Sequence, residues 1–310
     1  MAGIGVINNP RSRQNVRNPE RIPKLGYILG GRGESKETRT FEELEDCLRE
    51  FKRLSIDILA INGGDGSTHV TLTKLIEVYG EQPLPMIALL RGGTLNTISA
   101  SFGIKGQPDY ILYNIAAKYA EGAPFKTHET NLINANGKYS FLYGNGFVAN
   151  FMQTYYATGR PSPSHGVAVM LRGVASIFTG AGLARRWFEP VQAVVTIDGE
   201  TLPDRAFTAM LAATVENIGV GFRPWCRAFW EPDKFHAICF TSSPLSFAPD
   251  IPLVWFARPI HPRNAHEMLA KEMTIEAEKP FYYTQDGDMY TCEDGKMKIA
   301  IGPRVTIIVE

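Results

Sequence analysis

The stretch Ile61-Asn62-Gly63-Gly64-Asp65-Gly66-Ser67, followed further along by Gly92-Gly93-Thr94-Leu95-Asn96, decides the predicted fold. Each stretch comes directly after a short apolar run, residues 56–61 and 86–90, which is typical of a buried parallel strand. The segment 68–90 has the length of one helix and one strand, the crossover that joins neighbouring parallel strands. Both loops are therefore predicted at one edge of a sheet, where open α/β sheets bind ligands.

The composition of these loops predicts a nucleotide phosphate site. Glycines around one carboxylate let the backbone approach a phosphate, offer it N–H groups and hold an acid near the accompanying metal. A lone Gly-Gly-Asp-Gly stretch is often only a tight turn, and the second loop favours the phosphate interpretation. The strand 4–8 runs into Asn8-Asn9-Pro10-Arg11-Ser12-Arg13 at the same edge, where arginine could clamp phosphate or form only a solvated basic turn.

The pattern along the chain predicts two domains. Residues 1–127 alternate strand and helix, with helices over 41–54 and 109–121, and form an α/β domain with a mostly parallel sheet. Residues 128–310 carry many short strands, with hairpins around Asn136-Gly137 and Asp198-Gly199, and form a largely antiparallel β domain. Segment 242–252 is predicted as a loop and Gly30–Ser35 as a flexible turn.

Composition limits the classes of function. The 310 residues include 32 basic and 32 acidic side chains, so no global field attracts nucleic acid or anionic lipid. The cysteines lack a Cys-x-x-Cys pair, which argues against a zinc site and a disulfide framework; they are Cys47, Cys226, Cys239 and Cys292. The N-terminus turns polar too early for a signal peptide, and we expect a cytoplasmic protein.

The apolar segment 167–184 is predicted as an amphipathic helix and not as a membrane span. It contains the charged Arg172, and its apolar residues recur every three or four positions. Two interpretations stay open. The helix packs on a domain core with Arg185 and Arg186 near its C-terminus, or it is a surface helix whose basic-aromatic end touches a membrane.

Near the C-terminus, Gln285-Asp286-Gly287-Asp288 follows a predicted strand. Such a stretch is usually a turn between strands. If the loop reaches the nucleotide loops, one carboxylate could accept a proton from an attacking hydroxyl. In phosphoryl transfer, a general base contributes less to the rate than alignment of the reactants and charge neutralisation by Mg²⁺.

Together these motifs resemble the diacylglycerol kinase catalytic-domain superfamily of lipid kinases, which also contains the sphingosine and ceramide kinases. The resemblance covers nearly the whole chain. Its motifs are Asn9-Pro10-x-Ser12, Gly63–Ser67, Gly93–Asn96, Asn217 with Gly219 and Gly221, Pro232-Asp233 and Asp286–Asp288. It implies that residues 128–310 form an all-β, sandwich-like domain with a lipid pocket, whose last strand could return to the first domain. It also implies ATP with Mg²⁺ as phosphoryl donor and an active site in the interdomain cleft.

The resemblance also implies roles for individual residues. Asp65 serves the metal or the substrate hydroxyl, Asp286 is the general base, and Asp233 helps to hold a second, structural metal. The nucleotide is held by Asn9, Gly63, Gly64, Gly66, Ser67, Gly93, Thr94 and Asn96. Three acidic positions of the family are neutral here, Val70, Thr97 and Asn131, so Mg²⁺ should rely more on ATP and on Asp65.

The leading hypothesis is an ATP-dependent lipid kinase that phosphorylates diacylglycerol, ceramide or a sphingoid base. His69 is a faint hint at a sphingoid acceptor. The expected partners of the protein are the lipid substrate and the inner membrane surface, which it would contact as a peripheral protein. Nucleic acid is not an expected partner. The alternatives are an NAD kinase-like enzyme with a soluble acceptor and a non-catalytic nucleotide or lipid sensor. All depend on residues 63–67, 92–96 and 286–288 converging on one groove.

Overall fold

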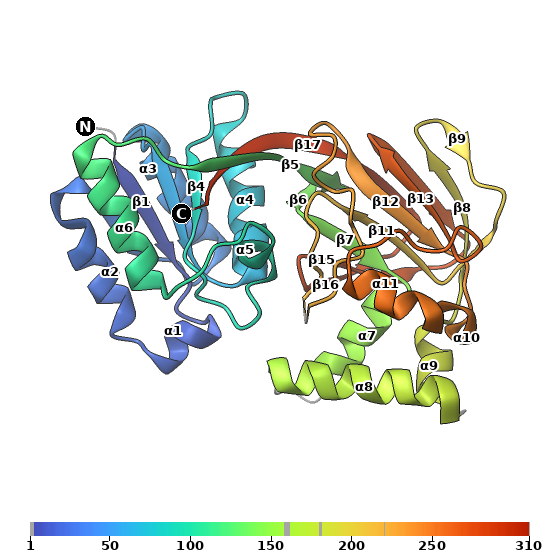
Figure 1. Cartoon of the computed structure of the whole chain (residues 1–310). Helices are drawn as coiled ribbons and strands as arrows, with labels where there is room; N and C mark the ends of the chain where they lie inside the picture. Colours follow the sequence, from blue (N-terminus) through green and yellow to red (C-terminus); the bar gives the residue numbers. More distant parts are fainter. Residues whose placement is uncertain (1–2, 158–161, 180–181, 220, 310) are drawn as a thin grey trace. The chain divides into compact units, whose positions relative to one another are not determined.

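The computed structural model describes residues 3–157, 162–179, 182–219 and 221–309, which form two compact units (Figure 1). Unit 1 contains Met1–Thr130 and Pro303–Glu310, and unit 2 contains Asn131–Gly302. Strands β5 (Thr127–Ala135) and β17 (Lys296–Ile308) each run across the boundary, so the chain passes between the units twice. The sequence-based boundary after residue 127 falls at the start of β5.

Unit 1 is built on a parallel sheet with strand order β2-β1-β3-β4-β17, in which the last residues of β17 pair beside β4 through Ile307 and Ile87. The other strands are β1 (Ile4–Asn8), β2 (Gly33–Glu37), β3 (Ile58–Asn62) and β4 (Met86–Leu89). Every residue of β1 and β3 is buried, which explains the apolar runs at residues 4–7 and 58–61. The predicted α/β fold with a mostly parallel sheet is confirmed.

Helices pack in pairs beside this sheet. Helix α2 (Arg21–Leu29) packs on α6 (Pro108–Glu121), and α3 (Phe41–Arg53) packs on α4 (Asp65–Tyr79) (Figure 1). The short helices of unit 1 are α1 (Arg13–Arg17), η1 (Gly30–Arg32) and α5 (Thr97–Ser101). The Thr40 hydroxyl accepts the N–H of Glu43 and caps α3, whose buried face carries Leu44, Leu48 and Phe51.

The prediction of a flexible turn at Gly30–Ser35 is wrong in its second half. Gly33–Glu37 forms β2, a parallel edge strand paired with β1 in register from Ile4 with Gly33 to Asn8 with Glu37. The sequence Gly-Glu-Ser-Lys-Glu has no apolar residue, and no side chain of β2 is buried. Backbone pairing with β1 and polar side-chain contacts hold the strand, including the bond from the Asn8 side-chain amide to the Ser35 hydroxyl. A periodicity of apolar residues cannot detect such a strand.

Unit 2 contains two antiparallel sheets that face each other across one core. The first has the order β10-β8-β14-β17 with β9, β5 and β6 attached, and the second has the order β13-β12-β11-β7-β15-β16. The core takes Ile133, Val195 and Met273 from the first sheet and Tyr143 and Phe235 from the second, so the predicted sandwich is confirmed. The strands are β6 (Lys138–Ser140), β7 (Leu142–Asn145), β8 (Val191–Ile197), β9 (Glu200–Thr201), β10 (Ala206–Phe207), β11 (Ala209–Ala213), β12 (Phe235–Phe240), β13 (Ala265–Ala270), β14 (Glu272–Ala277), β15 (Phe281–Gln285) and β16 (Asp288–Cys292).

Three hairpins of unit 2 have an Asn-Gly or Asp-Gly dipeptide as their two-residue turn. Asn136, Asp198 and Asp286 have φ of 48°, 47° and 47°, and each is followed by a glycine that also has positive φ. Two left-handed residues in a row are what a two-residue hairpin turn requires, and Asn-Gly and Asp-Gly tolerate them best. The predicted hairpins at 136–137 and 198–199 are confirmed, and Asp286 is the first turn residue between β15 and β16.

A group of helices accompanies the sandwich in unit 2. They are α7 (Phe147–Tyr156), α8 (Pro163–Thr179), α9 (Gly182–Trp187), α10 (Pro244–Phe247), η2 (Ala248–Asp250) and α11 (Ile251–Trp255). The predicted helix 167–184 overlaps α8 and α9, with residues 180–181 outside the described part. The loop predicted over 242–252 is wrong, because the Ser243 hydroxyl accepts the N–H of Ser246 and Pro244 starts α10.

Candidate functional site

Three polar loops lie at the carboxyl edge of the unit 1 sheet, after β1, β3 and β4. Asn8 and Asn62 end their strands in register, and the Asn62 side-chain amide donates to the Asn8 side-chain oxygen at 2.8 Å. Both asparagines are fully buried. Parallel strands bring these ends together because neighbouring strands finish at the same edge.

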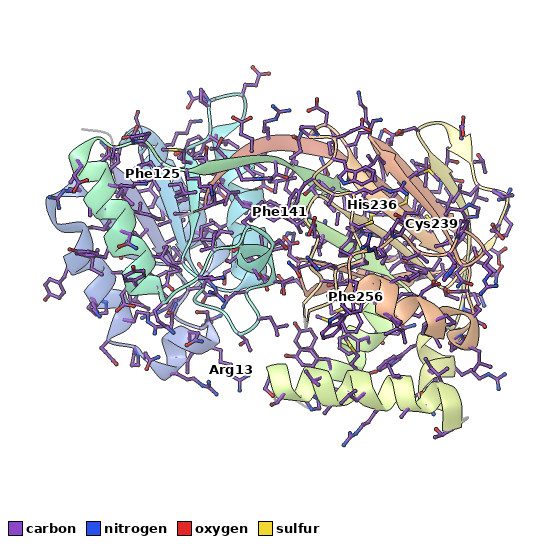
Figure 2. All side chains as sticks on the ribbon, in the orientation of Figure 1. Arg13, Phe125, Phe141, His236, Cys239 and Phe256 are labelled. Atoms are coloured by element: carbon purple, nitrogen blue, oxygen red, sulfur yellow. The ribbon has the colours of Figure 1, made fainter. Side chains whose placement is uncertain are left out.

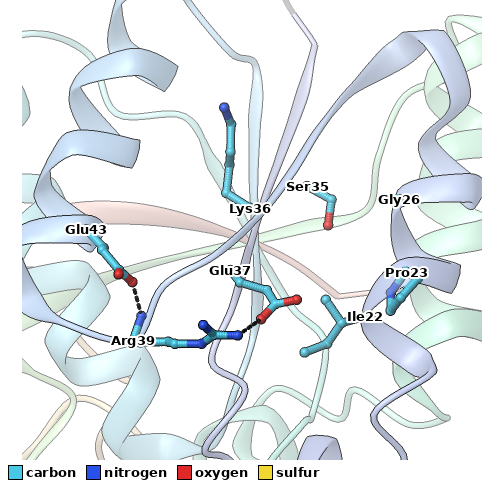
Figure 3. A pocket seen from close by; sticks show the side chains of 8 residues that line it. All are labelled: Ile22, Pro23, Gly26, Ser35, Lys36, Glu37, Arg39 and Glu43. Atoms are coloured by element: carbon cyan, nitrogen blue, oxygen red, sulfur yellow. Dashed lines mark hydrogen bonds and ion pairs between the residues drawn. The ribbon is translucent and has the colours of Figure 1, made fainter.

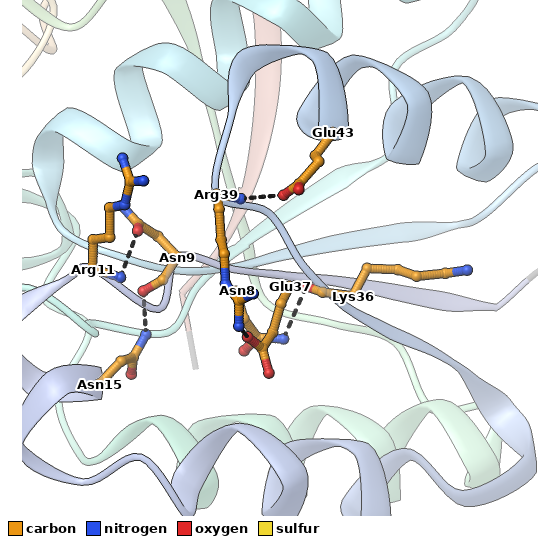
Figure 4. Close-up of polar contacts among 8 residues, drawn as sticks. All are labelled: Asn8, Asn9, Arg11, Asn15, Lys36, Glu37, Arg39 and Glu43. Carbon is orange, nitrogen blue, oxygen red and sulfur yellow. Dashed lines mark hydrogen bonds and ion pairs between the residues drawn. The ribbon is translucent and has the colours of Figure 1, made fainter.

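The loop after β1 binds both other loops. The Asn9 side-chain amide donates to the Ser67 hydroxyl at 2.8 Å. The Asn9 side-chain oxygen accepts the N–H of Arg11 at 2.9 Å (Figure 4). The Ser12 hydroxyl donates to the Gly92 carbonyl at 3.1 Å. Asn15 donates to the backbone oxygens of Asn9 and Asn62. The predicted residues Asn9 and Ser67 are thus direct partners.

The glycines of the second and third loops allow those loops to touch. A Cβ on Gly93 would lie 2.3 Å from the Gly64 Cα, and a Cβ on Gly92 would lie 2.5 Å from the Asn62 side-chain oxygen. A Cβ on Gly63 would lie 2.3 Å from the Ser67 Cβ. From the sequence, these glycines are attributed to the close approach of a phosphate. In the structure, the packing of the loops by itself leaves no room for a side chain at any of the three positions.

Asp65 connects the second loop to the helix that follows the third. Its two carboxylate oxygens accept the backbone N–H groups of Thr97 and Ile98 at 2.9 and 3.0 Å, at the first turn of α5. Burial raises the pKa of the Asp65 carboxyl above its usual value, although the N–H groups of Ile98 and Thr97 and the charge of Arg91 act in the opposite direction. Asp65 therefore has a structural role that its position in a glycine loop does not reveal.

The third loop is closed by its own asparagine. Asn96 has φ of 51°, and its side chain accepts the N–H of Gly93 at 3.0 Å and donates to the Gly93 carbonyl at 3.2 Å. Thr94 is half-buried between these two residues, and Gly66 is half-buried in the first turn of α4. Unit 1 therefore brings together all eight residues predicted to hold the nucleotide, together with Asp65, on three adjoining loops.

Two features of this edge were missed from the sequence. Arg91 directly follows the β4 run with φ of 57°, a conformation that L side chains rarely adopt and that often marks functional loops. A groove of about 500 Å³ lies between α2 and the end of β2, lined by Ile22, Pro23, Gly26, Ser35, Lys36, Glu37, Arg39 and Glu43 (Figure 3). No sequence signal marked the groove because β2 itself was not recognised.

Asp286 lies in unit 2, buried at the hairpin turn. Its carboxylate accepts the N–H groups of Phe141 and Leu142, at distances of 2.8–3.1 Å. Helix α7 supports the turn from behind, since the Tyr156 hydroxyl donates to the Gly287 carbonyl at 3.1 Å. The carboxylate is held in one orientation by these contacts, and its meeting with the loops of unit 1 stays a prediction.

The remaining predicted positions are distributed over both units. Asp233 is exposed in the segment before β12, and its role as a metal ligand stays a prediction. Asn131 donates its side-chain N–H to the Gly302 carbonyl at 2.9 Å, a bond that a carboxylate could not form. Val70 is half-buried on α4, and Thr97 uses its backbone N–H to bind Asp65.

Unit 2 also brings together Cys226, His236 and Glu267, whose side-chain ligand atoms lie within 4.8 Å of one another. His236 is fully buried on β12 (Figure 2), and its Nδ1 accepts the backbone N–H of Arg227 at 3.3 Å. The ring proton is therefore assigned to Nε2, which lies 3.1 Å from Glu267 Oε1 without hydrogen-bond geometry. A metal would need the lone pair that this proton occupies, so these three side chains are not arranged as a metal site.

Comparison with known protein families gives a match in unit 1. Residues 4–124 match the model of the diacylglycerol kinase catalytic domain, in agreement with the resemblance found in the sequence. No curated protein sequence matches the chain. Within the described residues, no helix is both long enough and apolar enough to cross a membrane.

The fold is similar to solved structures from Bacillus anthracis str. Sterne. One, titled "a putative diacylglycerol kinase", has a TM-score of 0.71 at 17% identity, over 99% of this chain and 96% of that chain. Another, titled a diacylglycerol kinase, has a TM-score of 0.64 at 16% identity, with the same coverage of 99% and 96%. At these identities the likeness establishes the fold.

Proposed function

We propose that the protein is an ATP-dependent lipid kinase that transfers the γ-phosphate to a hydroxyl of diacylglycerol, ceramide or a sphingoid base. The observation that carries the proposal is the set of three loops in unit 1. Asn9 binds Ser67, Gly64 contacts Gly93, and Asp65 binds the start of α5. The family of residues 4–124 supports phosphoryl transfer as the chemistry.

The charge of the loops suits a polyphosphate. Residues 8–13, 62–67 and 91–96 contain three arginines, Arg11, Arg13 and Arg91, and a single acid, Asp65. Helix α4 begins in the second loop, and no side chain caps its N-terminus. The positive end of a 15-residue helix dipole and its first N–H groups would then contribute to binding the phosphates.

The loops offer fewer ligands to Mg²⁺ than to phosphate. Asp65 is their only acid, and each of its oxygens already accepts one N–H, which leaves lone pairs for a metal-bound water or a direct contact. Mg²⁺ is usually held by one or two carboxylates and by substrate phosphates, which fits this arrangement. When bound, the ion would neutralise charge on the transferred phosphoryl group.

Asp286 is the proposed general base for the lipid hydroxyl. The N–H groups of Phe141 and Leu142 orient its carboxylate, and a fixed orientation is what proton abstraction requires. Binding and alignment of ATP on unit 1 would supply most of the rate. The acceptor is a membrane lipid, so the enzyme is proposed to work at the cytoplasmic face of the membrane.

Transfer of radiolabelled phosphate from ATP to a panel of diacylglycerol, monoacylglycerol, ceramide and sphingosine tests the proposal. We expect Mg²⁺-dependent labelling of at least one lipid, and labelling that is strongly reduced in Asp286→Asn. A lipid-free arm with NAD tests the alternative acceptor, and labelling of NAD alone would refute the lipid assignment. Thermal stabilisation by ATP without labelling of any acceptor would instead support a nucleotide sensor.

A further inference from the structure

Helix α8 presents apolar side chains to solvent on one side of unit 2. Leu171 is 63% exposed and Val167 is 39% exposed, and Ala175 is exposed one turn further on. Residues four positions apart lie on one stripe of a helix. Along this stripe α8 carries alkyl groups where a water-facing helix normally carries polar ones.

The opposite side of α8 is already used in packing. Val169 is buried in a small core with Trp187 and Phe188, and a Cβ on Gly173 would lie 2.0 Å from the Trp187 ring. The helix contacts α7, α9 and α10, which lie on its inner side (Figure 1). Packing within unit 2 therefore does not explain the exposed apolar stripe.

The surface around α8 is cationic in a chain whose net charge is zero. The sequence has no Asp or Glu between Phe147 and Phe188, although it contains 32 acidic residues in total. Arg172 on α8 and Arg185 and Arg186 on α9 are exposed. A helix with an apolar stripe and only basic charges is typical of segments that lie in the interface of a membrane.

Neighbouring helices also carry exposed apolar side chains together with basic ones. Leu245 on α10, which contacts α8, is 65% exposed. Trp255 and Phe256, at the end of α11, are 46% and 68% exposed, and Arg258 is exposed two residues later. Aromatic rings beside basic side chains are common anchors at the level of lipid headgroups.

We propose that α8 and the arginines beside it dock on the surface of an anionic lipid bilayer. The 17 residues of α8 form a helix about 25 Å long, which would lie in the plane of the interface. Leu171 and Val167 would enter the acyl boundary, and the arginines would contact lipid phosphates. A nucleic acid gives an alkyl stripe no apolar contact, and a second copy would bring a face of the same positive charge.

Sedimentation with lipid vesicles tests this docking without any kinase chemistry. The vesicles contain either phosphatidylcholine alone or phosphatidylcholine with phosphatidylglycerol, and neither ATP nor an acceptor lipid is present. We expect binding to the anionic vesicles that weakens as salt rises, and weak binding to the neutral ones. Failure of this binding would leave the kinase proposal standing, and failure of phosphate transfer would leave the docking standing.

Two variants and two matched controls locate the surface. Arg185→Ala with Arg186→Ala should reduce partitioning at low salt roughly 30-fold. Its control is Arg32→Ala with Arg53→Ala, which removes the same charge from exposed sites of unit 1 and should leave binding within about twofold.

Leu171→Gln should reduce binding roughly tenfold, because it removes an apolar group from the acyl boundary. Its control is Tyr113→Gln at a site that is 61% exposed on α6. Circular dichroism checks that each variant is folded. If Leu171→Gln does not fold, the double arginine variant is sufficient to test the docking surface. Unchanged binding of the folded arginine variant, an equal loss in its control, or equal binding to neutral vesicles would each overturn the docking surface.

Discussion

Replacing Gly93 by alanine tests whether direct contact between the two glycine loops holds the site together. The added Cβ would lie 2.3 Å from the Gly64 Cα and 2.9 Å from the Asn96 side-chain oxygen. Neither neighbour can turn away, because one is backbone and the other already accepts the Gly93 N–H at 3.0 Å. The loops must therefore separate. Overpacking of this kind costs about 2 kcal/mol, which corresponds to a fall in Tm of roughly 4–8 °C.

Thermal unfolding of the nucleotide-free protein, followed by circular dichroism, measures this effect. Gly31→Ala is the matched control, since a Cβ there would meet nothing within 4 Å. The control should stay within about 0.5 kcal/mol of the wild type. If Gly93→Ala melts at the same temperature as Gly31→Ala, the loops are not in the contact described, and the argument for a preformed site fails.

Three further predictions concern titratable side chains. Asp65→Ala should destabilise the protein by about 0.5–2 kcal/mol in urea unfolding, because two N–H groups of α5 lose their acceptor, and Asp65→Asn should cost less; a wild-type midpoint for Asp65→Ala would contradict this. Asp286→Asn should lower lipid phosphorylation about 10²–10⁴-fold while the stabilisation by ATP is kept, and a wild-type rate would exclude Asp286 as the base. Burial raises the pKa of the Cys239 thiol from 9.0 to about 12, so the native state binds more protons than the unfolded state above pH 9, and stability should fall as the pH rises from there. Urea unfolding at increasing pH measures that fall, and Cys239→Ala should weaken it; an identical fall in the variant would contradict the role of the thiol.

The sequence predicts those parts of the fold that depend on apolar periodicity. Strand β1 occupies the predicted residues 4–8, and α3 starts at the predicted Phe41, because their buried faces carry the pattern. Strand β2 has no buried apolar residue and could not be found in this way. Helix α7, with Phe147 and Phe151 in its sequence, follows a turn at Gly146 that has φ of 57°, and no apolar pattern marks this reversal.

The sequence likewise predicts some features of the candidate site and not others. The positions of its loops at strand ends follow from local sequence, so Asn9, Gly64 and Gly93 were found. The bond from Asp65 to the N–H groups of α5 depends on two loops that meet only in the folded sheet. Arg91 was missed because its backbone conformation, and not its residue type, makes it unusual.

The passage of β17 across the unit boundary has a consequence for biosynthesis. Residues 303–310 belong to unit 1, and Ile307 of β17 pairs with Ile87 of β4. A nascent chain that has released only its first 130 residues from the ribosome has an open edge at β4, with unpaired backbone groups. The N-terminal unit can complete its sheet only after residues 131–302 of the second unit have been translated, so folding of the first unit finishes after synthesis of the second.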